Sequence, residues 1–266
     1  MSLSPTAMTT QAQPETVALF VSDLHLQAAM PQTTAAFVDF LELHASRAQQ
    51  LYLLGDIFEA WAGDDDLDDA YNLRIVEALA NLSASGVALY WMAGNRDFLA
   101  GERFAQRSGA ALLPDPFIST IAGKTIVLTH GDAYCTDDAA YMQFRAQVRD
   151  PRWQQQFLAR PLQERKAIIE SLREGSREAQ RSKSYEIMDV NAEAIDQLFA
   201  NSGAATMIHG HTHRPARHER TNGGQTLQRY VLSDWDLDHG QPRGDWLAID
   251  AAGNIRRYSL NLLRAV

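Results

Sequence analysis

Five short polar stretches, each at the end of an apolar run, constrain the fold of this chain more than any other feature. The apolar runs (VALFVS, LYLL, VALYWMA, KTIVLT and ATMI) have the composition of buried strands. Ligands of open α/β sheets bind beyond the carboxyl ends of the strands, so we expect the five stretches to converge on one crevice. The stretches are Asp23-Leu24-His25, Gly55-Asp56, Gly94-Asn95-Arg96-Asp97, His130-Gly131-Asp132 and His209-Gly210-His211-Thr212-His213.

Helical segments alternate with the early strands, whereas the late strands follow one another directly. Helices are predicted at Thr33–Gln49, Ala70–Ser85 and Phe98–Ser108. The late part predicts short strands joined by glycine turns, as at Asn222-Gly223. This order of elements predicts an α/β fold of two packed mixed β-sheets. The strands expected after the third polar stretch are Phe117–Ile121, Lys124–Thr129, Arg217–Glu219, Leu227–Ser233, Trp246–Asp250 and Ile255–Ser259.

The segment between the fourth and fifth polar stretches has a different character. Its helical pattern is interrupted at Pro151, Pro161 and Gly175, and it must leave the sheet and return to it. Residues 145–183 carry ten Lys or Arg and five Asp or Glu, a local charge of +5 in a chain of −9. We interpret this segment as a helical cap inserted over the crevice. The predicted organisation is a disordered tail at 1–16, a core at 17–136 and 201–266, and the cap at 137–200.

Charge and composition narrow the functional class. A net charge of −9 argues against general nucleic-acid binding. The single cysteine, Cys135, fits a reducing compartment, and we expect it to be inert. No apolar run approaches the roughly 20 residues of a membrane helix, and the polar first sixteen residues do not read as a signal peptide. We therefore expect a cytoplasmic protein, with contact to a membrane surface left open.

The residue types of the five stretches favour a metal centre. A lone Asp at a strand end is more often a helix cap or turn former, so each stretch is weak evidence by itself. Together they offer carboxylate, amide and imidazole ligands without a thiolate, a set that suits Mn²⁺, Fe²⁺, Zn²⁺ or Co²⁺. Two ions about 3.5–4 Å apart need a bridging ligand. Asp56, the sole carboxylate on its turn, is the expected bridge.

The ordered motifs resemble those of the calcineurin-like metallophosphoesterase superfamily. SDLHL, LGDIFEAWAGDDD, GNRDFL, HGDAYCTDDAAY, SKSYEIMDVN and HGHTHRP are similar, more narrowly, to the UDP-2,3-diacylglucosamine pyrophosphohydrolase family of lipid A biosynthesis. The resemblance implies a β-sandwich flanked by helices, with His209 outside the ligand set and placed in the core or beside a ligand. It implies a first ion at Asp23, His25, Asp56 and His213, and a second ion at Asp56, Asn95, His130 and His211.

The same resemblance implies an activity. Water attacks the α-phosphorus of UDP-2,3-diacylglucosamine and releases UMP and 2,3-diacylglucosamine 1-phosphate, with two divalent ions, expected to be Mn²⁺. The expected setting is the cytoplasmic face of the inner membrane, to which the enzyme binds peripherally. Asp138 can equally be the N-cap of the following helix, and Gln180 replaces the asparagine that is usual in the family. The catalytic residues implied are Asn95 and Arg96, and the substrate-binding residues are Asn95, Arg96, Asp138, Ser176, Gln180, Lys183 and His211.

Arg96 is the sharpest clue to the bond that is cleaved. Many superfamily members resemble Gly-Asn-His here, where the histidine can protonate an alkoxide leaving group. Arginine cannot act as a general acid, but it can offset the charge of a phosphate leaving group. A phosphoanhydride is therefore favoured over an ester. The alternative interpretation is a plain salt bridge between Arg96 and Asp97.

Three further questions stay open at the level of sequence. The mixture of bases and apolar residues in the cap matches an anionic head group with acyl chains, or an anionic bilayer. A solvated charged face is the plainer alternative, which we prefer for Arg165 and Glu170, and loop solvation or capping is expected of the run Asp64-Asp65-Asp66. The competing functions are hydrolysis of another nucleotide diphosphate or phosphodiester, and a metal-stabilised binding scaffold without activity.

Overall fold

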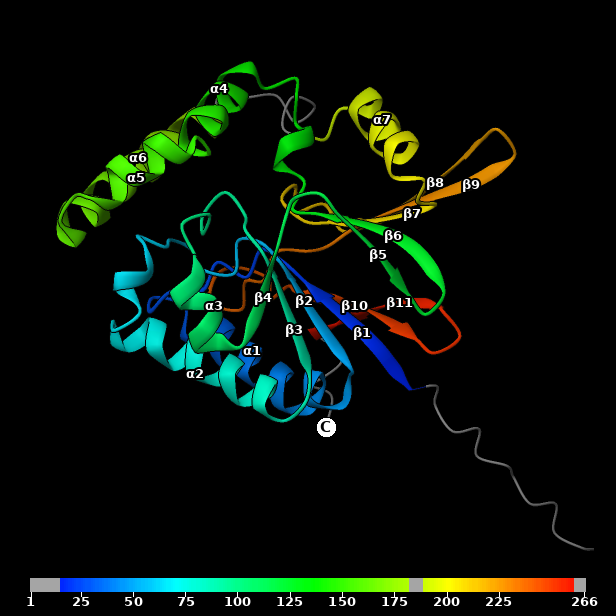
Figure 1. Ribbon diagram of the computed structural model, residues 1–266, viewed down its shortest axis with the longest axis horizontal. Helices are drawn as coiled ribbons and strands as arrows, with labels where there is room; N and C mark the ends of the chain where they lie inside the picture. Colours follow the sequence, from blue (N-terminus) through cyan, green and yellow to red (C-terminus); the bar gives the residue numbers. More distant parts are fainter. Residues whose placement is uncertain (1–14, 182–188, 261–266) are drawn as a thin grey trace, which may run out of the picture.

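The computed structural model describes residues 15–181 and 189–260 as two β-sheets that pack face to face between layers of helices (Figure 1). The six-stranded sheet has the order β11-β10-β1-β2-β3-β4. Its strands β1 to β4 run parallel to one another. At one side β10 pairs antiparallel with β1, and β11 pairs antiparallel with β10. The bounds are β1 (Thr16–Val21), β2 (Gln50–Leu54), β3 (Ala88–Met92), β4 (Ala110–Leu113), β10 (Asp245–Asp250) and β11 (Ile255–Ser259).

The five-stranded sheet has the order β5-β6-β7-β9-β8. Strands β6, β7 and β9 are parallel, and the two edge strands are antiparallel to their neighbours. Both sheets are therefore mixed, as predicted. The bounds are β5 (Phe117–Ile121), β6 (Lys124–Thr129), β7 (Thr206–His209), β8 (Ala216–Asn222) and β9 (Gln225–Val231).

Alternating side chains of the central strands fill the space between the two sheets. In β1, Ala18 and Phe20 face the second sheet, whereas Leu19 and Val21 face the helices. The ring of Phe20 stacks on Tyr52 with centroids 5.0 Å apart, and Tyr52 stacks on Tyr90 at 4.6 Å. Because β1 and β2 are buried on both faces over most of their length, the sequence of each is a nearly continuous apolar run.

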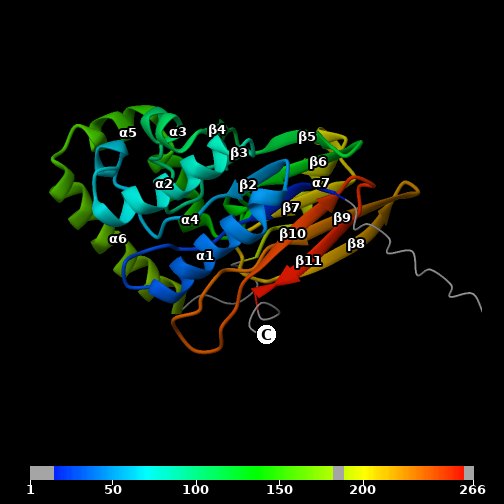
Figure 2. The same ribbon diagram turned by 90° about the horizontal axis from the view of Figure 1, so that it is seen from below.

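Helices cover the outer face of each sheet. Helices α1 (Pro31–Leu43), α2 (Ala70–Ala84) and α3 (Glu102–Ser108) lie against the six-stranded sheet (Figure 2). Helix α7 (Ala192–Ser202) packs on the five-stranded sheet, where Leu198 and Phe199 meet Val127 and Met207. The predicted α/β fold of two mixed sheets flanked by helices is confirmed.

The inserted segment forms three further helices, α4 (Ala139–Val148), α5 (Pro151–Leu158) and α6 (Leu162–Arg181). They lie together beyond one end of the sheets (Figures 1 and 2). Breaks occur near Pro151 and Pro161 as predicted, but the break expected at Gly175 is wrong, since α6 continues through it. Of the residues described, no helix is long and apolar enough to cross a membrane. The division into core and cap stays a prediction, because α7 ends the predicted cap yet packs on a sheet.

Other boundaries differ from the sequence expectation for physical reasons. Helix α1 ends at Leu43, and a 3₁₀ turn at Ala45–Arg47 replaces its predicted last turn. Helix α3 starts at Glu102 instead of Phe98, because the residues before it form a loop of the site. Strand β4 was not predicted, since it is a four-residue edge strand. The expected tail falls almost wholly outside the described residues, as does Lys183, and the side chain of Gln180 is outside them too.

Candidate metal centre

The structure brings the polar stretches together at the carboxyl ends of their strands. Asp23 and His25 follow β1, Asp56 follows β2, and Asn95 and Arg96 follow β3. From the second sheet, β6 delivers one imidazole and β7 delivers two. The residues contributed by these two strands are His130, His211 and His213. The convergence predicted from the sequence is therefore present in the fold.

The backbone of this site is held in an uncommon conformation. Non-glycine residues seldom adopt positive φ, and holding them there costs about 1–3 kcal/mol each. Gly94 and Gly210 permit close approach of the loops, since a Cβ there would lie 2.1 Å from Asp56 Oδ1 and 2.2 Å from Asp23 Oδ2. Such strain gathers at functional sites. Positive φ between 49° and 66° occurs at Asp23, His25, Asp56, His211 and His213.

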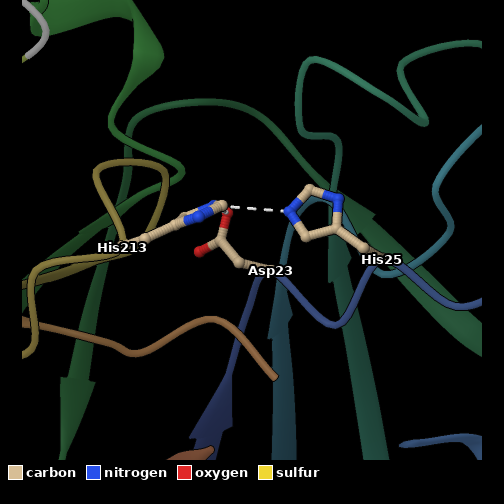
Figure 3. Close-up of side chains that lie close together, drawn as sticks. All are labelled: Asp23, His25 and His213. Atoms are coloured by element: carbon tan, nitrogen blue, oxygen red, sulfur yellow. Dashed lines mark hydrogen bonds and ion pairs between the residues drawn. The ribbon is translucent and has the colours of Figure 1, made fainter. Parts of the chain in front are cut away.

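The first group of candidate ligands is Asp23, His25 and His213, whose donor atoms all lie within 4.8 Å of one another (Figure 3). The Nε2 atoms of the two histidines are 3.3 Å apart, and His213 Nε2 is 3.3 Å from Asp23 Oδ1. The other oxygen of Asp23 accepts hydrogen bonds from Ser22 Oγ and the backbone amide of His211. Two imidazole nitrogens and a buried carboxylate oxygen thus face one point, an arrangement that fits a divalent ion.

The second group is Asp23, Asp56 and His130, again with donor atoms within 4.8 Å of one another. His130 Nε2 is 3.7 Å from Asp56 Oδ1 and 3.0 Å from Asn95 Oδ1. His130 Nδ1 donates to the carbonyl oxygen of Leu54, which leaves Nε2 to act as a ligand. The ring of His211 packs against that of His130, with centroids 5.1 Å apart.

Asp23 is the residue that belongs to both groups, whereas Asp56 belongs to the second. The charge of Asp56 nevertheless acts on both sides of the centre. Burial lowers the pKa of His25 to about 4 against the opposing effect of Asp56. Burial also opposes protonation of His130, but Asp56 and Asp23 raise its pKa to about 9. The bridging role of Asp56 stays a prediction, with its carboxylate near histidines of both groups.

Several residues support the candidate ligands in roles that the sequence does not predict. Asp97 is fully buried and accepts hydrogen bonds of 2.8 Å from the backbone amides of Gly94 and Ile57, so it ties two site loops together. Glu59 accepts from His25 Nδ1 at 2.8 Å, and Asp234 lies 3.7 Å from His213 Nδ1. Asp97 stands in the third polar stretch and Glu59 in the LGDIFEAWAGDDD motif, whereas Asp234 lies outside every motif.

Arg96 lines a cavity beside the candidate ligands and does not pair with Asp97. Its guanidinium Nε is buried without a hydrogen-bond partner within the described ranges, and Arg96 and Asp97 form no ion pair. The salt-bridge interpretation is therefore wrong. The backbone amide of Arg96 donates to Asp56 Oδ1 at 2.7 Å, which fixes the residue beside the candidate ligands.

A cavity of about 540 Å³ extends from the centre beneath the inserted helices. Asn95, Arg96, Asp138, Ser176 and His211 are among the polar residues that line it, and most of the other lining residues are apolar. The Asp138 carboxylate also accepts from the amide of Tyr141 at 3.1 Å, so its predicted N-cap role is confirmed. The apolar wall includes Phe98, Phe144, Val148, Trp153, Phe157, Ile169 and Leu172.

The acidic run after β2 attaches helices to the core. Asp64 accepts from the amides of Gly101 and Phe104 at 3.0 Å, which caps α3 as expected. Asp65 pairs with Arg165, which also donates to the carbonyl of Ala62. Arg165 is only 1% exposed, so the prediction of a solvated position was wrong for it.

Two remaining residues match their expectations. His209 is fully buried in the core, with Nδ1 2.9 Å from the carbonyl of Gly210 and Nε2 facing Arg229. Cys135 is buried, and burial raises its pKa to about 12, which keeps the thiol protonated and unreactive.

Comparison with known proteins agrees with this geometry. Residues 17–215 match the calcineurin-like phosphoesterase family. The chain is 51% identical over 222 residues to the UDP-2,3-diacylglucosamine hydrolase of Chromohalobacter salexigens, covering 84% of this chain and 90% of that protein. It is 49% identical over 228 residues to the protein of the same name from Aromatoleum aromaticum, covering 86% and 93%. The chain therefore belongs to the calcineurin-like phosphoesterase family and, within it, to the family of the UDP-2,3-diacylglucosamine hydrolases.

Proposed function

We propose that this protein hydrolyses the diphosphate of UDP-2,3-diacylglucosamine to UMP and 2,3-diacylglucosamine 1-phosphate, a step of lipid A biosynthesis. One observation carries the proposal: the candidate ligands and a largely apolar cavity share residues. Asn95 and His211 belong to both, so an anionic diphosphate at the ligands leaves its acyl chains beside apolar walls.

The residues at the strand ends would hold two divalent ions, which we propose to be Mn²⁺. Bound there, such ions lower the pKa of a coordinated water and so supply a nucleophile near neutral pH. Asp56 would serve both ions. The first set is Asp23, His25, Asp56 and His213, and the second is Asp56, Asn95, His130 and His211.

Arg96 would act on the leaving side of the reaction. A guanidinium stays protonated, so it stabilises developing negative charge without giving up a proton. Its buried Nε has no competing hydrogen-bond partner among the described residues, and the side chain lines the cavity. This position suits charge on the departing 2,3-diacylglucosamine 1-phosphate.

The inserted helices would bind the lipid portion and face the membrane. Trp153 and Phe157 stack at 4.9 Å and line the cavity, a surface that suits acyl chains. Exposed apolar side chains on the inserted helices, at Phe144 and Leu172, stand among basic residues. We propose peripheral binding to the anionic cytoplasmic face of the inner membrane. The proposed substrate contacts of the cap are Asp138, Ser176, Gln180 and Lys183.

The test compares three substrates with Mn²⁺ present: UDP-2,3-diacylglucosamine, ADP-ribose and bis(p-nitrophenyl) phosphate. We expect UMP release from the lipid to be fastest and Asp56→Ala to abolish it together with metal binding. Faster turnover of ADP-ribose would assign the site to another nucleotide diphosphate. If the Asp56→Ala variant kept the turnover rate and the metal content of the wild type, the two-ion mechanism would be refuted.

A further inference from the structure

We propose that Glu59 is a positioning residue for His25, and that Arg173 makes this support depend on where helix α6 lies. The proposal deepens the proposed function, since it rests on His25 being a ligand. It assigns a second role to the inserted helices: they stabilise the first of the two ion sites through the carboxylate that contacts its ligand His25.

The contact between Glu59 and His25 decides which imidazole nitrogen is available. Glu59 Oε2 lies 2.8 Å from His25 Nδ1. A carboxylate can only accept, so Nδ1 carries the hydrogen and Nε2 keeps its lone pair. That Nε2 faces His213 Nε2 at 3.3 Å, within the first ligand group (Figure 3). The backbone amide of Glu59 also donates to Leu26, the residue after His25, so the carboxylate is held close by.

The second oxygen of Glu59 is bound by the cap. Oε1 forms an ion pair with the Arg173 guanidinium, and the two side chains are only 16% and 19% exposed. Arg173 lies on one face of α6 with Arg165 and Ile169, at spacings of four residues. Arg165 pairs with Asp65, and Ile169 packs against the core. This face attaches α6 to the loop after β2, and Arg173 is the position at which the attachment reaches a candidate ligand.

The other histidine of the first group is supported without the cap. His213 Nδ1 lies 3.7 Å from the Asp234 carboxylate, which accepts hydrogen bonds of 2.6–3.0 Å from the Arg243 guanidinium. Arg243 comes from the loop before β10, not from an inserted helix. Both histidines thus have a carboxylate held by an arginine. Movement of α6 would release the carboxylate behind His25 and leave the one behind His213 in place.

Two consequences follow for the ions and the substrate. Loss of a partner of this kind typically weakens metal affinity about 10–100-fold. The first site should therefore weaken when Arg173 is removed, while the second should not, because His130 is held by the Leu54 carbonyl. Since α6 also lines the cavity, a ligand that fixes α6 should tighten the first ion, and the ion should tighten that ligand equally.

The experiment titrates metal-free protein with Mn²⁺ in the absence of substrate, with bound and free ion distinguished by electron paramagnetic resonance. Arg173→Met is compared with Lys166→Met, a matched variant on the same helix that loses ion pairs to Asp66 and Asp69 but touches no candidate ligand. We expect Arg173→Met to weaken one of two sites about tenfold. Lys166→Met should leave both within twofold. Equal weakening in the two variants would show that α6 contributes docking alone.

A second pair of variants guards against a folding defect in Arg173→Met. Glu59→Gln keeps an oxygen for His25 but loses the ion pair, and Glu59→Ala loses both. We expect Mn²⁺ affinity at the first site to fall in the order wild type, Glu59→Gln, Glu59→Ala, with unchanged circular dichroism. Unaltered affinity in Glu59→Ala would overturn the inference even if the lipid is hydrolysed. Failure of the wild type to release UMP with two Mn²⁺ bound would overturn the proposed function alone.

Discussion

Arg149, the residue directly after α4, donates a hydrogen bond of 2.8 Å to the carbonyl oxygen of Gly94, the residue before Asn95. Its guanidinium also lies 5.3 Å from the centroid of the Phe98 ring and 3.9 Å from Asp132. The loop after β3 carries both proposed catalytic residues, and a hydrogen bond therefore attaches it to the C-terminal end of α4.

We predict that Arg149→Met lowers kcat/KM by about tenfold, because a hydrogen bond from a charged donor contributes about 1.5–3 kcal/mol and only part of it bears on the loop. Steady-state kinetics at saturating Mn²⁺ measures the change. The control is Arg152→Met, since Arg152 is 88% exposed and pairs only with Asp150 among the described residues. Equal kinetics in the two variants would show that α4 does not position the loop.

The carboxylate of Asp97 should contribute more to stability than a carboxylate that caps a surface helix. Asp97→Ala leaves the buried amides of Gly94 and Ile57 without an acceptor, at about 1–3 kcal/mol each. Asp69→Ala removes the N-cap of α2, which typically costs about 1 kcal/mol. Urea unfolding should show a loss at least twice as large for Asp97→Ala. A loss equal to that of Asp69→Ala would contradict the tie between the loops.

Sequence reasoning located the site because strand periodicity and strand ends are local signals. Asp23 and His130 directly follow an apolar run, and Asp56 follows one after a single glycine, so the sheet itself brings them to one edge. The carboxylates behind the ligands carry no such signal. Glu59 is an ordinary loop residue in the sequence, and only the tertiary fold places it against His25. Asp97 stands in the third polar stretch, but its hydrogen bond from the amide of Ile57 depends on the fold as well.

The errors in the inserted segment have the same origin. Gly175 is expected to end a helix on propensity alone, but an interior glycine costs only about 1 kcal/mol relative to alanine, and α6 continues through it to Arg181. Arg165 has the sequence context of a solvated base. It is buried because the loop after β2 folds beneath α6 and offers Asp65 and the Ala62 carbonyl.

The ion pair between Arg165 and Asp65 should respond asymmetrically to the loss of either partner. The Arg165 side chain is almost fully buried, whereas that of Asp65 is half exposed. Asp65→Ala leaves a buried cation without its counter-charge, a change that costs about 3–5 kcal/mol in fully buried pairs and less here. Arg165→Met leaves an exposed carboxylate that water solvates. We expect thermal denaturation to show the lower Tm in Asp65→Ala, and the reverse order would refute this account.

Cys135 should stay unreactive until the protein unfolds. Burial, with Asp132 and Asp189 nearby, raises its pKa to about 12, against about 8.5 in an unfolded chain. A raised folded pKa stabilises the fold below the unfolded pKa, and this contribution is lost as pH rises from about 8.5 towards 12. Mass spectrometry should detect no iodoacetamide adduct at pH 8 in the native protein and complete labelling in urea. Equal labelling rates would contradict the burial of the thiol.

The apolar wall of the cavity should matter for the lipid substrate and not for a small diphosphate. Leu172 on α6 lines the cavity, whereas Leu158 on α5 is equally exposed, at 41% against 43%, but lies outside the cavity lining. An aspartate at a wall position removes an apolar contact worth about 1.5–3 kcal/mol when fully buried. We expect Leu172→Asp to raise KM for UDP-2,3-diacylglucosamine about tenfold or more and to leave ADP-ribose hydrolysis unchanged. Leu158→Asp should alter neither, and an equal effect of Leu172→Asp on both substrates would show that this wall acts on the catalytic centre and not on acyl chains.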